Sequence, residues 1–393
     1  MVEYLFLKPL DVLYLRGNRL FGAAGDHSEA LMPPWPSVAS GAIRTRILAE
    51  HLSGQGITWK QFAENTTPKG PLGECLGTYE NPGTFQVTHF SVGRINNGSA
   101  EFFLPLPADA AVQEGTPCAA QYLLPGRLGQ GVRSSYPLDQ LPILRITAPK
   151  KSVREICLNQ AGVAAYVSGQ DIGPTHTTKA SDLWCSETRL GIAMSAVSRT
   201  ADEGRIYTST VVAMKEGAGF LVGIAGAQGF VPKSGLLRFG GDGRAVEIRP
   251  CSIAFPEPPW QALQESRRFK LMFQTPGLFP DGWRFPGFER RNGQWFWAWK
   301  SCEARLAAVA LSRPEVISGW DLAKSRPKFA LKSVPAGSVY WFEDLRGDVA
   351  DLKPLLVDGI QVKQETMFRQ RQAEGFNRVL IGAWPEKTGV SPQ

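Results

Sequence analysis

Short strand-like runs separated by glycine- and proline-rich stretches follow one another along the chain, and one order of elements occurs twice. Each time, a strand is followed by a long loop, paired strands, a helical segment, a Gly-Arg loop and a last strand. The first series ends with a strand at 245–249, and the second runs from 269–274 to 379–384. This order fits two domains that each have a four-stranded antiparallel sheet backed by helices. We therefore predict an α+β fold of two ferredoxin-like (RRM-like) domains.

The proline-rich segment 256–259 lies between the two series. We predict an N-terminal domain over 1–250 and a C-terminal domain with a glycine-rich loop over 251–393. From about 54 to 185 the pattern weakens, and short strand-like runs alternate with Gly/Pro-rich stretches. This part is predicted as a long, loop-rich insertion in the N-terminal domain.

The clearest helix is predicted over 37–52. Ile43 and Ile47 repeat there at helical spacing, and Ser37 follows a proline at the position where an N-cap is expected. A hairpin is predicted from the strands 205–212 and 220–224, which flank a glycine-containing turn. Shorter helices are predicted after Pro232 and over 360–371.

Composition excludes several classes of protein. No apolar run approaches the roughly 20 residues that span a bilayer, so we expect no membrane partner. The N-terminus has no basic segment before an apolar core, so a cytoplasmic protein is expected. The six cysteines include no C-x-x-C pair, and we predict no zinc site, no disulfide framework and no cofactor. The 43 Lys+Arg against 36 Asp+Glu give a net charge of +7, which favours polyanionic partners.

One face of the predicted helix is a candidate anion site. Ser37, Ser40, Gly41 and Arg44 follow at i, i+3, i+4 and i+7, and we place them opposite the isoleucine stripe. Small residues allow a ligand to approach the first-turn N–H groups, and an arginine adds a bidentate phosphate donor. The alternative is an ordinary amphipathic helix with a serine cap.

Two Gly-Arg loops are further candidates for phosphate binding. One contains Gly240, Gly241 and Arg244, and the other contains Gly375, Asn377 and Arg378. Glycines allow main-chain N–H groups to form an anion-binding concavity. The alternative, which is favoured for an isolated glycine cluster, is a tight turn that needs a positive φ.

Basic residues also gather in other predicted loops. Such cations suit a single-stranded nucleic acid that is held through its phosphates. They are Arg16 and Arg19, with Asn18 between them, then Arg127, Arg133, Lys150, Lys151 and Arg154. The alternating Trp295, Trp297 and Trp299 could stack bases, but packing in the core is the favoured interpretation.

For catalysis the sequence offers only four histidines, at 27, 51, 89 and 176. A metal-independent ribonuclease that uses His27 or His51 as general acid or base is the alternative to a non-catalytic binder. No H-x-x-x-H or G-x-S-x-G motif supports hydrolysis. We therefore predict no catalytic residues.

Taken together, the motifs resemble the third-subunit family of the Cmr complex, the type III-B CRISPR effector, within the RAMP superfamily. The Arg-Gly-Asn-Arg turn at 16–19 and the Gly-Phe-Asn-Arg loop at 375–378 are part of this resemblance, and Asn377 stands where a RAMP loop often carries glycine. The matching segments occur in order at 9–13, 16–22, 35–45, 104–109, 187–192, 202–207, 238–244, 275–283, 334–340 and 375–382.

The resemblance implies a non-catalytic, RNA-binding subunit that acts in antiviral defence. Such subunits hold the 5′ tag of the CRISPR RNA and dock the large polymerase/cyclase-like subunit. An adjacent RAMP subunit of the complex backbone is a further expected partner. The runner-up from the same superfamily is a CRISPR-RNA-processing endoribonuclease.

Overall fold

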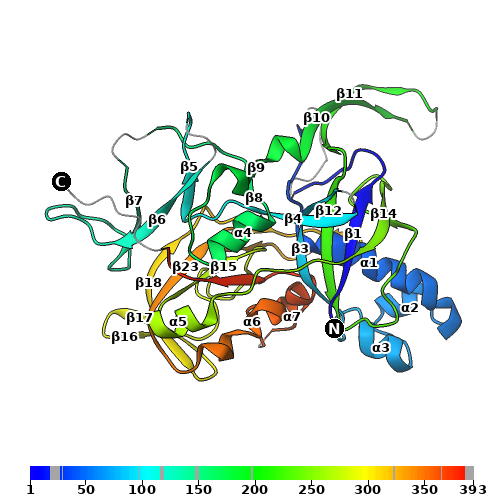
Figure 1. The fold of residues 1–393 in the computed structure, drawn as a ribbon. Helices are drawn as coiled ribbons and strands as arrows, with labels where there is room; N and C mark the ends of the chain where they lie inside the picture. Colours follow the sequence, from blue (N-terminus) through cyan, green and yellow to red (C-terminus); the bar gives the residue numbers. More distant parts are fainter. Residues whose placement is uncertain are drawn as a thin grey trace. The chain divides into compact units, whose positions relative to one another are not determined.

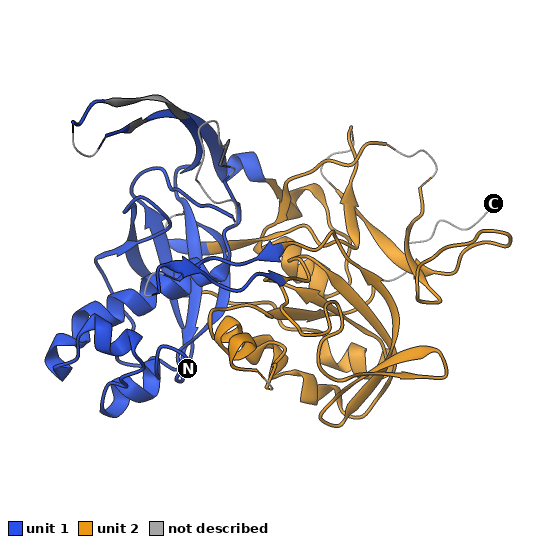
Figure 2. Cartoon of the chain, turned by 180° about the vertical axis from the view of Figure 1, so that it is seen from behind, with its two compact units in different colours: residues 1–100, 180–252, 316–331 blue, residues 101–179, 253–315, 332–393 orange. Residues whose placement is uncertain are grey.

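The computed structural model describes residues 1–17, 27–28, 30–96, 98–115, 119–146, 150–195, 198–321, 324–363 and 365–385 (Figure 1). Helices and mostly antiparallel strands confirm the predicted α+β class. None of the helices in these ranges is long and apolar enough to cross a membrane. The chain divides into two compact units (Figure 2). Unit 1 contains Met1–Ala100, Ala180–Ser252 and Val316–Leu331, and unit 2 contains Glu101–Lys179, Ile253–Glu315 and Lys332–Gln393.

Unit 1 is built on an antiparallel sheet in which β1 is central. β1 pairs with β12 on one side and with β14 on the other, and β12 also pairs with β3, so the order is β14-β1-β12-β3. The strands and helices of this unit are β1 (Glu3–Pro9), β2 (His27–Ser28), α1 (Pro36–His51), α2 (Trp59–Ala63), α3 (Gly70–Leu76), β3 (Gln86–Asn96), β10 (Trp184–Met194), β11 (Ala201–Met214), β12 (Ala218–Ala225), β13 (Leu236–Arg238), β14 (Ala245–Cys251), β19 (Val316–Ile317), β20 (Trp320–Asp321) and β21 (Arg326–Pro327).

The helix α1 covers this sheet and lies next to β3 and β13. Its first residue is Pro36, whose fixed φ and missing N–H suit the first turn of a helix. Trp35 occupies the N-cap position, so the prediction of a Ser37 cap is wrong. Ile43 and Ile47 are buried as expected. The helix therefore forms where the apolar spacing predicted it, but it begins one residue earlier.

Two local predictions in unit 1 are wrong. The strands predicted at 205–212 and 220–224 do not form a hairpin, because β11 pairs with β10 whereas β12 pairs with β1 and β3. Both segments are strands, but β11 pairs with β10, the strand directly before it in the chain, and the partners of β12 come from distant parts of the sequence. The segment after Pro232 has no helix and leads directly into β13.

Unit 2 contains a six-stranded antiparallel sheet with the order β16-β17-β18-β23-β15-β24. A separate three-stranded sheet, β5-β6-β7, is formed by part of the predicted insertion. The elements of this unit are β4 (Ser99–Pro105), β5 (Ala110–Val112), β6 (Ala120–Gly126), β7 (Leu141–Leu144), β8 (Ile156–Leu158), α4 (Gln160–Val167), β9 (Thr177–Lys179), α5 (Trp260–Ser266), β15 (Phe269–Phe273), β16 (Phe288–Arg291), β17 (Gln294–Trp299), β18 (Cys302–Ala310), β22 (Leu331–Lys332), β23 (Val339–Arg346), α6 (Leu355–Asp358), α7 (Thr366–Ala373) and β24 (Val379–Gly382).

Aromatic side chains form much of the core of unit 2. Every residue of β15 is buried, and Phe273 lies within 6 Å of Phe285 and Tyr340 by ring centroid. Trp297 is also buried, while its neighbours Trp295 and Trp299 are only half-buried. The favoured interpretation of the tryptophan stripe as core is thus confirmed for Trp297. The helix predicted over 360–371 is shorter and corresponds to α7.

A buried ion pair joins four elements of unit 2. The Nζ of Lys270 in β15 lies 3.3 Å from a carboxylate oxygen of Asp109, and both side chains are fully buried. The Tyr166 hydroxyl donates to the same carboxylate at 2.9 Å, and its ring lies 3.5 Å from Nζ by centroid. The rings of Tyr122 and Trp341 lie 4.8 and 5.1 Å from Nζ. Burial lowers the pKa of Lys270 and raises that of Asp109, so the hydrogen bonds and the aromatic rings must compensate the lost hydration.

Removing one partner of this pair should destabilise the fold strongly. Asp109→Ala leaves the Lys270 ammonium buried without its counterion, which typically costs about 3–5 kcal/mol. Urea unfolding followed by circular dichroism measures this loss. The double variant Asp109→Leu with Lys270→Met removes both charges and should lose clearly less stability. If the single and the double variant lost the same free energy of unfolding, the two buried charges would not depend on each other for their stability.

Candidate nucleic-acid interface

The four predicted residues of α1 do not form one exposed face. Gly41 is exposed, and no atom would contact a Cβ placed there. Ser40 is buried, because it stands three and seven residues before Ile43 and Ile47 and therefore shares their face. Its placement opposite the isoleucine stripe was wrong. Ser37 is half-buried in the first turn.

Arg44 holds elements of unit 1 together. Its Nη2 donates to the carbonyl oxygen of Leu76 at the end of α3, at 3.0 Å. Its guanidinium also lies over the Phe85 ring, 5.6 Å from the centroid. The side chain is half-buried between α1, α3 and the residue that precedes β3. These contacts give Arg44 a structural role in the described structure.

The first arginine turn is only partly described. Arg16 is exposed, and its guanidinium lies 6.0 Å from the centroid of the Tyr14 ring. Asn18 and Arg19 lie outside the described residues. Arg16 therefore remains a candidate on the surface of unit 1.

The first Gly-Arg loop is the turn between β13 and β14. Gly240 has φ +77°, and a Cβ there would lie 2.6 Å from the carbonyl oxygen of Tyr14. Gly241 donates its N–H to that oxygen at 2.8 Å. Arg244 forms an ion pair with Asp11 and lies 3.5 Å from a carboxylate oxygen of Asp242. The glycines thus meet the needs of a tight turn, and neighbouring carboxylates neutralise the arginine.

The second Gly-Arg loop is buried inside unit 2. Asn377 is fully buried, and its side-chain oxygen accepts from the N–H of Leu278 at 2.7 Å. The Arg378 guanidinium donates to the carbonyl oxygens of Val357 and Gln372 at 2.6 and 3.1 Å. Burial lowers the pKa of Arg378 to about 10. Gly375 is buried too and has φ +102°. The loop therefore connects α6, α7 and β24 and presents no side chain of these three residues to solvent.

The described histidines are not arranged as a general acid and base. His51 packs its ring edge-on against Phe230, and buried His89 shares a hydrogen bond with Ser91. His176 accepts a hydrogen bond from the N–H of Gly173. The side chain of His27 lies outside the described part. Within the described residues, no group of three potential ligands is placed to hold a metal ion.

Cations without an ion-pair partner among the described residues gather on the sheet β5-β6-β7 and its flanking segments, residues 110–154, which we call the basic arm (Figure 1). All six of its cations are exposed, and none forms an ion pair with another described residue. Elsewhere in unit 2, by contrast, Arg291 and Arg305 are each held by two carboxylates. The six are Arg127, Arg133, Arg145, Lys150, Lys151 and Arg154.

The backbone of the arm gathers these cations into two groups, one at each end of the sheet. The N–H of Glu114 donates to the carbonyl oxygen of Lys151, and the N–H of Val153 donates to that of Val112, both at 2.8 Å. The segment 150–154 therefore runs alongside β5. At the other end of the sheet, Nη2 of Arg145 lies 3.7 Å from the position that a Cβ of Gly126 would occupy. Hence Arg145 lies beside the start of the loop that carries Arg127 and Arg133.

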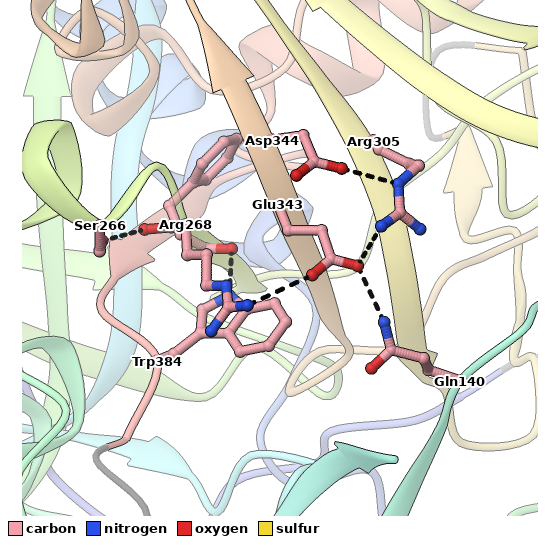
Figure 3. A network of polar contacts seen from close by, with 8 residues as sticks. Gln140, Ser266, Arg268, Arg305, Glu343, Asp344 and Trp384 are labelled. Atoms are coloured by element: carbon pink, nitrogen blue, oxygen red, sulfur yellow. Dashed lines mark hydrogen bonds and ion pairs between the residues drawn. The ribbon is translucent and has the colours of Figure 1, made fainter. Parts of the chain in front are cut away.

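A polar network attaches the arm to the six-stranded sheet of unit 2. Figure 3 shows Glu343 of β23 at its centre. Its carboxylate accepts from Gln140 at 2.8 Å, pairs with Arg305 at 2.7 Å and lies 3.8 Å from Arg268. Arg305 is also bound by Asp344 at 2.9 Å. Gln140 directly precedes β7, so this contact fixes the second end of the exposed loop.

Tyr136 is the other anchor of that loop. Its hydroxyl accepts from the N–H of Val309 and donates to the carbonyl oxygen of Val309, both at 2.8 Å. Burial raises the pKa of Tyr136 to about 12, so the hydroxyl keeps the proton that it donates. The exposed segment 127–135 is thus held at its C-terminal end on β18.

The sequence identified five of the six arm cations as loop charges and missed Arg145. The missed signal was the short apolar strand at 141–144, which brings Arg145 back toward Gly126. The spacing of residues along the sequence could not show which cations form ion pairs. In the described structure the arm cations form none, whereas Arg244 is neutralised by carboxylates. That difference depends on contacts between residues far apart in the sequence.

The model of the family described as CRISPR-associated protein (Cas_Cmr3) matches residues 5–384. No curated protein matches the chain. Similar chains occur in two solved structures, "Cryo-EM structure of the Type III-B Cmr-beta bound to cognate target RNA" and "Cryo-EM structure of the Type III-B Cmr-beta bound to cognate target RNA and AMPPnP, state 1". The first has 14% identity and a TM-score of 0.48 and covers 95% of this chain and 94% of that chain. The second has 14% identity and a TM-score of 0.45, with coverages of 94% and 93%.

Loss of the Tyr136 hydroxyl should loosen the arm without unfolding unit 2. Tyr136→Phe removes both bonds to Val309, and each such bond typically contributes about 1 kcal/mol. Together these losses amount to about 2 kcal/mol, so hydrogen exchange should become up to about thirty-fold faster at Val309 and in β7. Mass spectrometry of peptides that cover 306–312 and 138–146 measures this. Tyr14→Phe, a change in unit 1, is the control, and unchanged exchange in Tyr136→Phe would exclude an anchoring role.

Proposed function

The chain belongs to the family of CRISPR-associated proteins described as Cas_Cmr3, and from this premise we propose that it is a non-catalytic RNA-binding subunit of a type III-B Cmr effector complex. The family match confirms the resemblance that the ordered sequence motifs indicated. The proposed ligand is the 5′ tag of the CRISPR RNA. The proposed protein partners are the large polymerase/cyclase-like subunit and an adjacent RAMP subunit of the backbone.

The basic arm is the observation that carries the RNA-binding proposal. Six exposed cations that form no ion pair with any carboxylate of the described ranges make a surface whose charge must be balanced by counterions. A phosphodiester chain that displaces those counterions gains the entropy of their release. Lysines and arginines that emerge from loops and strand ends suit the phosphates of a single strand and do not require a particular base sequence.

Of the residues first singled out, Arg16 and Gly41 keep an accessible position in this proposal, because both are exposed. Arg44, Arg244 and Arg378 are assigned to stabilising the fold through their intramolecular contacts. The arm cations take over the phosphate-binding role. The RNA contact is therefore proposed mainly on unit 2.

The strand orders support two ferredoxin-like modules. In unit 1 the order β14-β1-β12-β3 is fourth, first, third and second along the chain. In unit 2 the order β24-β15-β23-β18 follows the same rule. In unit 1 α1 lies between the first and second of these strands, and in unit 2 α7 lies between the third and fourth. These are the two helix positions of a βαββαβ unit.

Replacing arm cations should weaken RNA binding at any base sequence. Arg127→Ala, Arg133→Ala, Lys150→Ala and Lys151→Ala together should lower the affinity for single-stranded RNA. The slope of log affinity against log salt should become shallower by about 0.7 for each phosphate that the variant no longer neutralises. Fluorescence anisotropy of a labelled CRISPR-tag oligonucleotide, recorded at several salt concentrations, measures both quantities.

The matched control is Lys60→Ala with Lys215→Ala, because both lysines are exposed on unit 1. This variant should keep the affinity and the salt slope of the unchanged protein. If the arm variant binds RNA as the unchanged protein does, the arm is not the RNA surface.

The absence of catalysis is tested directly. Labelled precursor CRISPR RNA incubated with the purified chain in the presence of a chelator should stay intact, because no described histidine lies in a general acid–base arrangement. Gel electrophoresis follows the RNA over time. Cleavage that disappears in His51→Ala or His27→Ala would replace the scaffold proposal with the ribonuclease alternative.

A further inference from the structure

Two guanidinium groups lie over one indole ring at the edge of the six-stranded sheet of unit 2. The Cζ atoms of Arg284 and Arg290 lie 5.1 and 5.8 Å from the centroid of the Trp295 ring. Cation–π attraction holds a guanidinium by its face and leaves its N–H groups available to an anion. In the described structure, the two guanidinium groups donate only one hydrogen bond between them, and it is long: Nε of Arg290 donates to the Gly293 carbonyl oxygen at 3.4 Å.

The neighbouring Arg291, by contrast, is bound by carboxylates. Its Nη2 lies 2.7 Å from carboxylate oxygens of both Glu289 and Glu303. Neither Arg284 nor Arg290 forms an ion pair with any residue in the described ranges. Two of the local carboxylates are therefore committed to Arg291, and the Arg284–Arg290 pair retains uncompensated positive charge.

The strand register places the charged pair on an aromatic surface. Phe288 stands opposite Trp297, and Arg290 stands opposite Trp295. Because side chains alternate along a strand, Phe288 and Arg290 share one face of the sheet, and Glu289 and Arg291 share the other. Trp283 adds to the first face, with its ring edge-on to Trp295 at 6.0 Å.

The strand β16 also has a free edge. In the described structure it is the terminal strand of its sheet and pairs only with β17. The N–H and C=O groups on its outer side can therefore accept a further strand. An extended peptide that adds to such an edge gains main-chain hydrogen bonds, and alternate side chains provide the specificity.

We propose that β16 binds an extended acidic segment of a partner protein as an additional strand. An apolar side chain of the segment packs against Phe288, and a carboxylate two residues away binds Arg290, with Arg284 as a second donor. The free main-chain edge matches a peptide and has no counterpart in a nucleic acid, and a Trp–Arg surface is typical of the centres of protein interfaces. This site shares none of the six arm cations and does not depend on the RNA-binding proposal, although Asp139 of the arm accepts a hydrogen bond from Gln294, next to Trp295, at 3.5 Å.

A charge-exchange experiment tests the site. The probes are a fluorescein-labelled nonapeptide in which threonines alternate with valine and glutamate, the same peptide with lysine for glutamate, and a labelled oligouridylate. Anisotropy is measured with the full chain, with Arg284→Glu plus Arg290→Glu, and with the control Arg313→Glu plus Lys363→Glu, whose positions are exposed in unit 2. Thermal unfolding of each variant establishes that it is folded.

The acidic peptide should bind the unchanged chain and the control about ten-fold more tightly than the lysine peptide, and the Arg284/Arg290 variant should reverse this preference. Equal affinities for the two peptides, or no binding of either, would overturn the proposal. So would loss of oligouridylate binding in the Arg284/Arg290 variant without any effect on the peptides, because the pair would then serve RNA.

Discussion

The buried ion pair between Lys270 and Asp109 is the contact on which the architecture of unit 2 depends. It joins β15, which lies between β23 and β24, to the residue that precedes β5, and its aromatic surroundings come from β6, α4 and β23. A buried ammonium tolerates few alternative arrangements, since each of them must again supply a counterion and hydrogen-bond acceptors. The pair therefore fixes where the basic arm leaves the core, and the Glu343 network and Tyr136 fix where it returns.

The arginines and lysines of the described structure differ in their partners: some bind carboxylates or main-chain carbonyl oxygens, and others form no ion pair. Arginines that connect elements, such as Arg44 and Arg378, use their donors on main-chain carbonyl oxygens, and Arg291 and Arg305 use theirs on carboxylates. In the described structure, none of the arm cations forms an ion pair with a carboxylate, and neither does Arg284 or Arg290. A net charge of +7 thus understates the local excess at these two surfaces, and we propose a different anionic partner for each.

The aromatic content of unit 2 serves both the core and the surface. Trp297 is buried within the cluster of β15, β17 and β23, whereas Trp295, two residues earlier on the same face, is half-buried beneath two arginines. The same alternation of tryptophans therefore has two roles. Both tryptophans stand beside the terminal strand β16, so their position along β17 decides between them: Trp297 lies opposite Phe288, whereas Trp295 lies opposite Arg290.

Sequence alone determined the family, the α+β class, the helix α1 and most of the strands, because apolar spacing and turn residues act locally. It placed five of the six arm cations in loops, but it also selected Ser40, Asn377 and Arg378, which are buried. Tertiary structure decided the partners of β12, the assignment of 101–179 to unit 2 and the choice of which arginines meet carboxylates. These outcomes depend on contacts between distant residues, and local spacing carries no information about which strands and side chains will be neighbours.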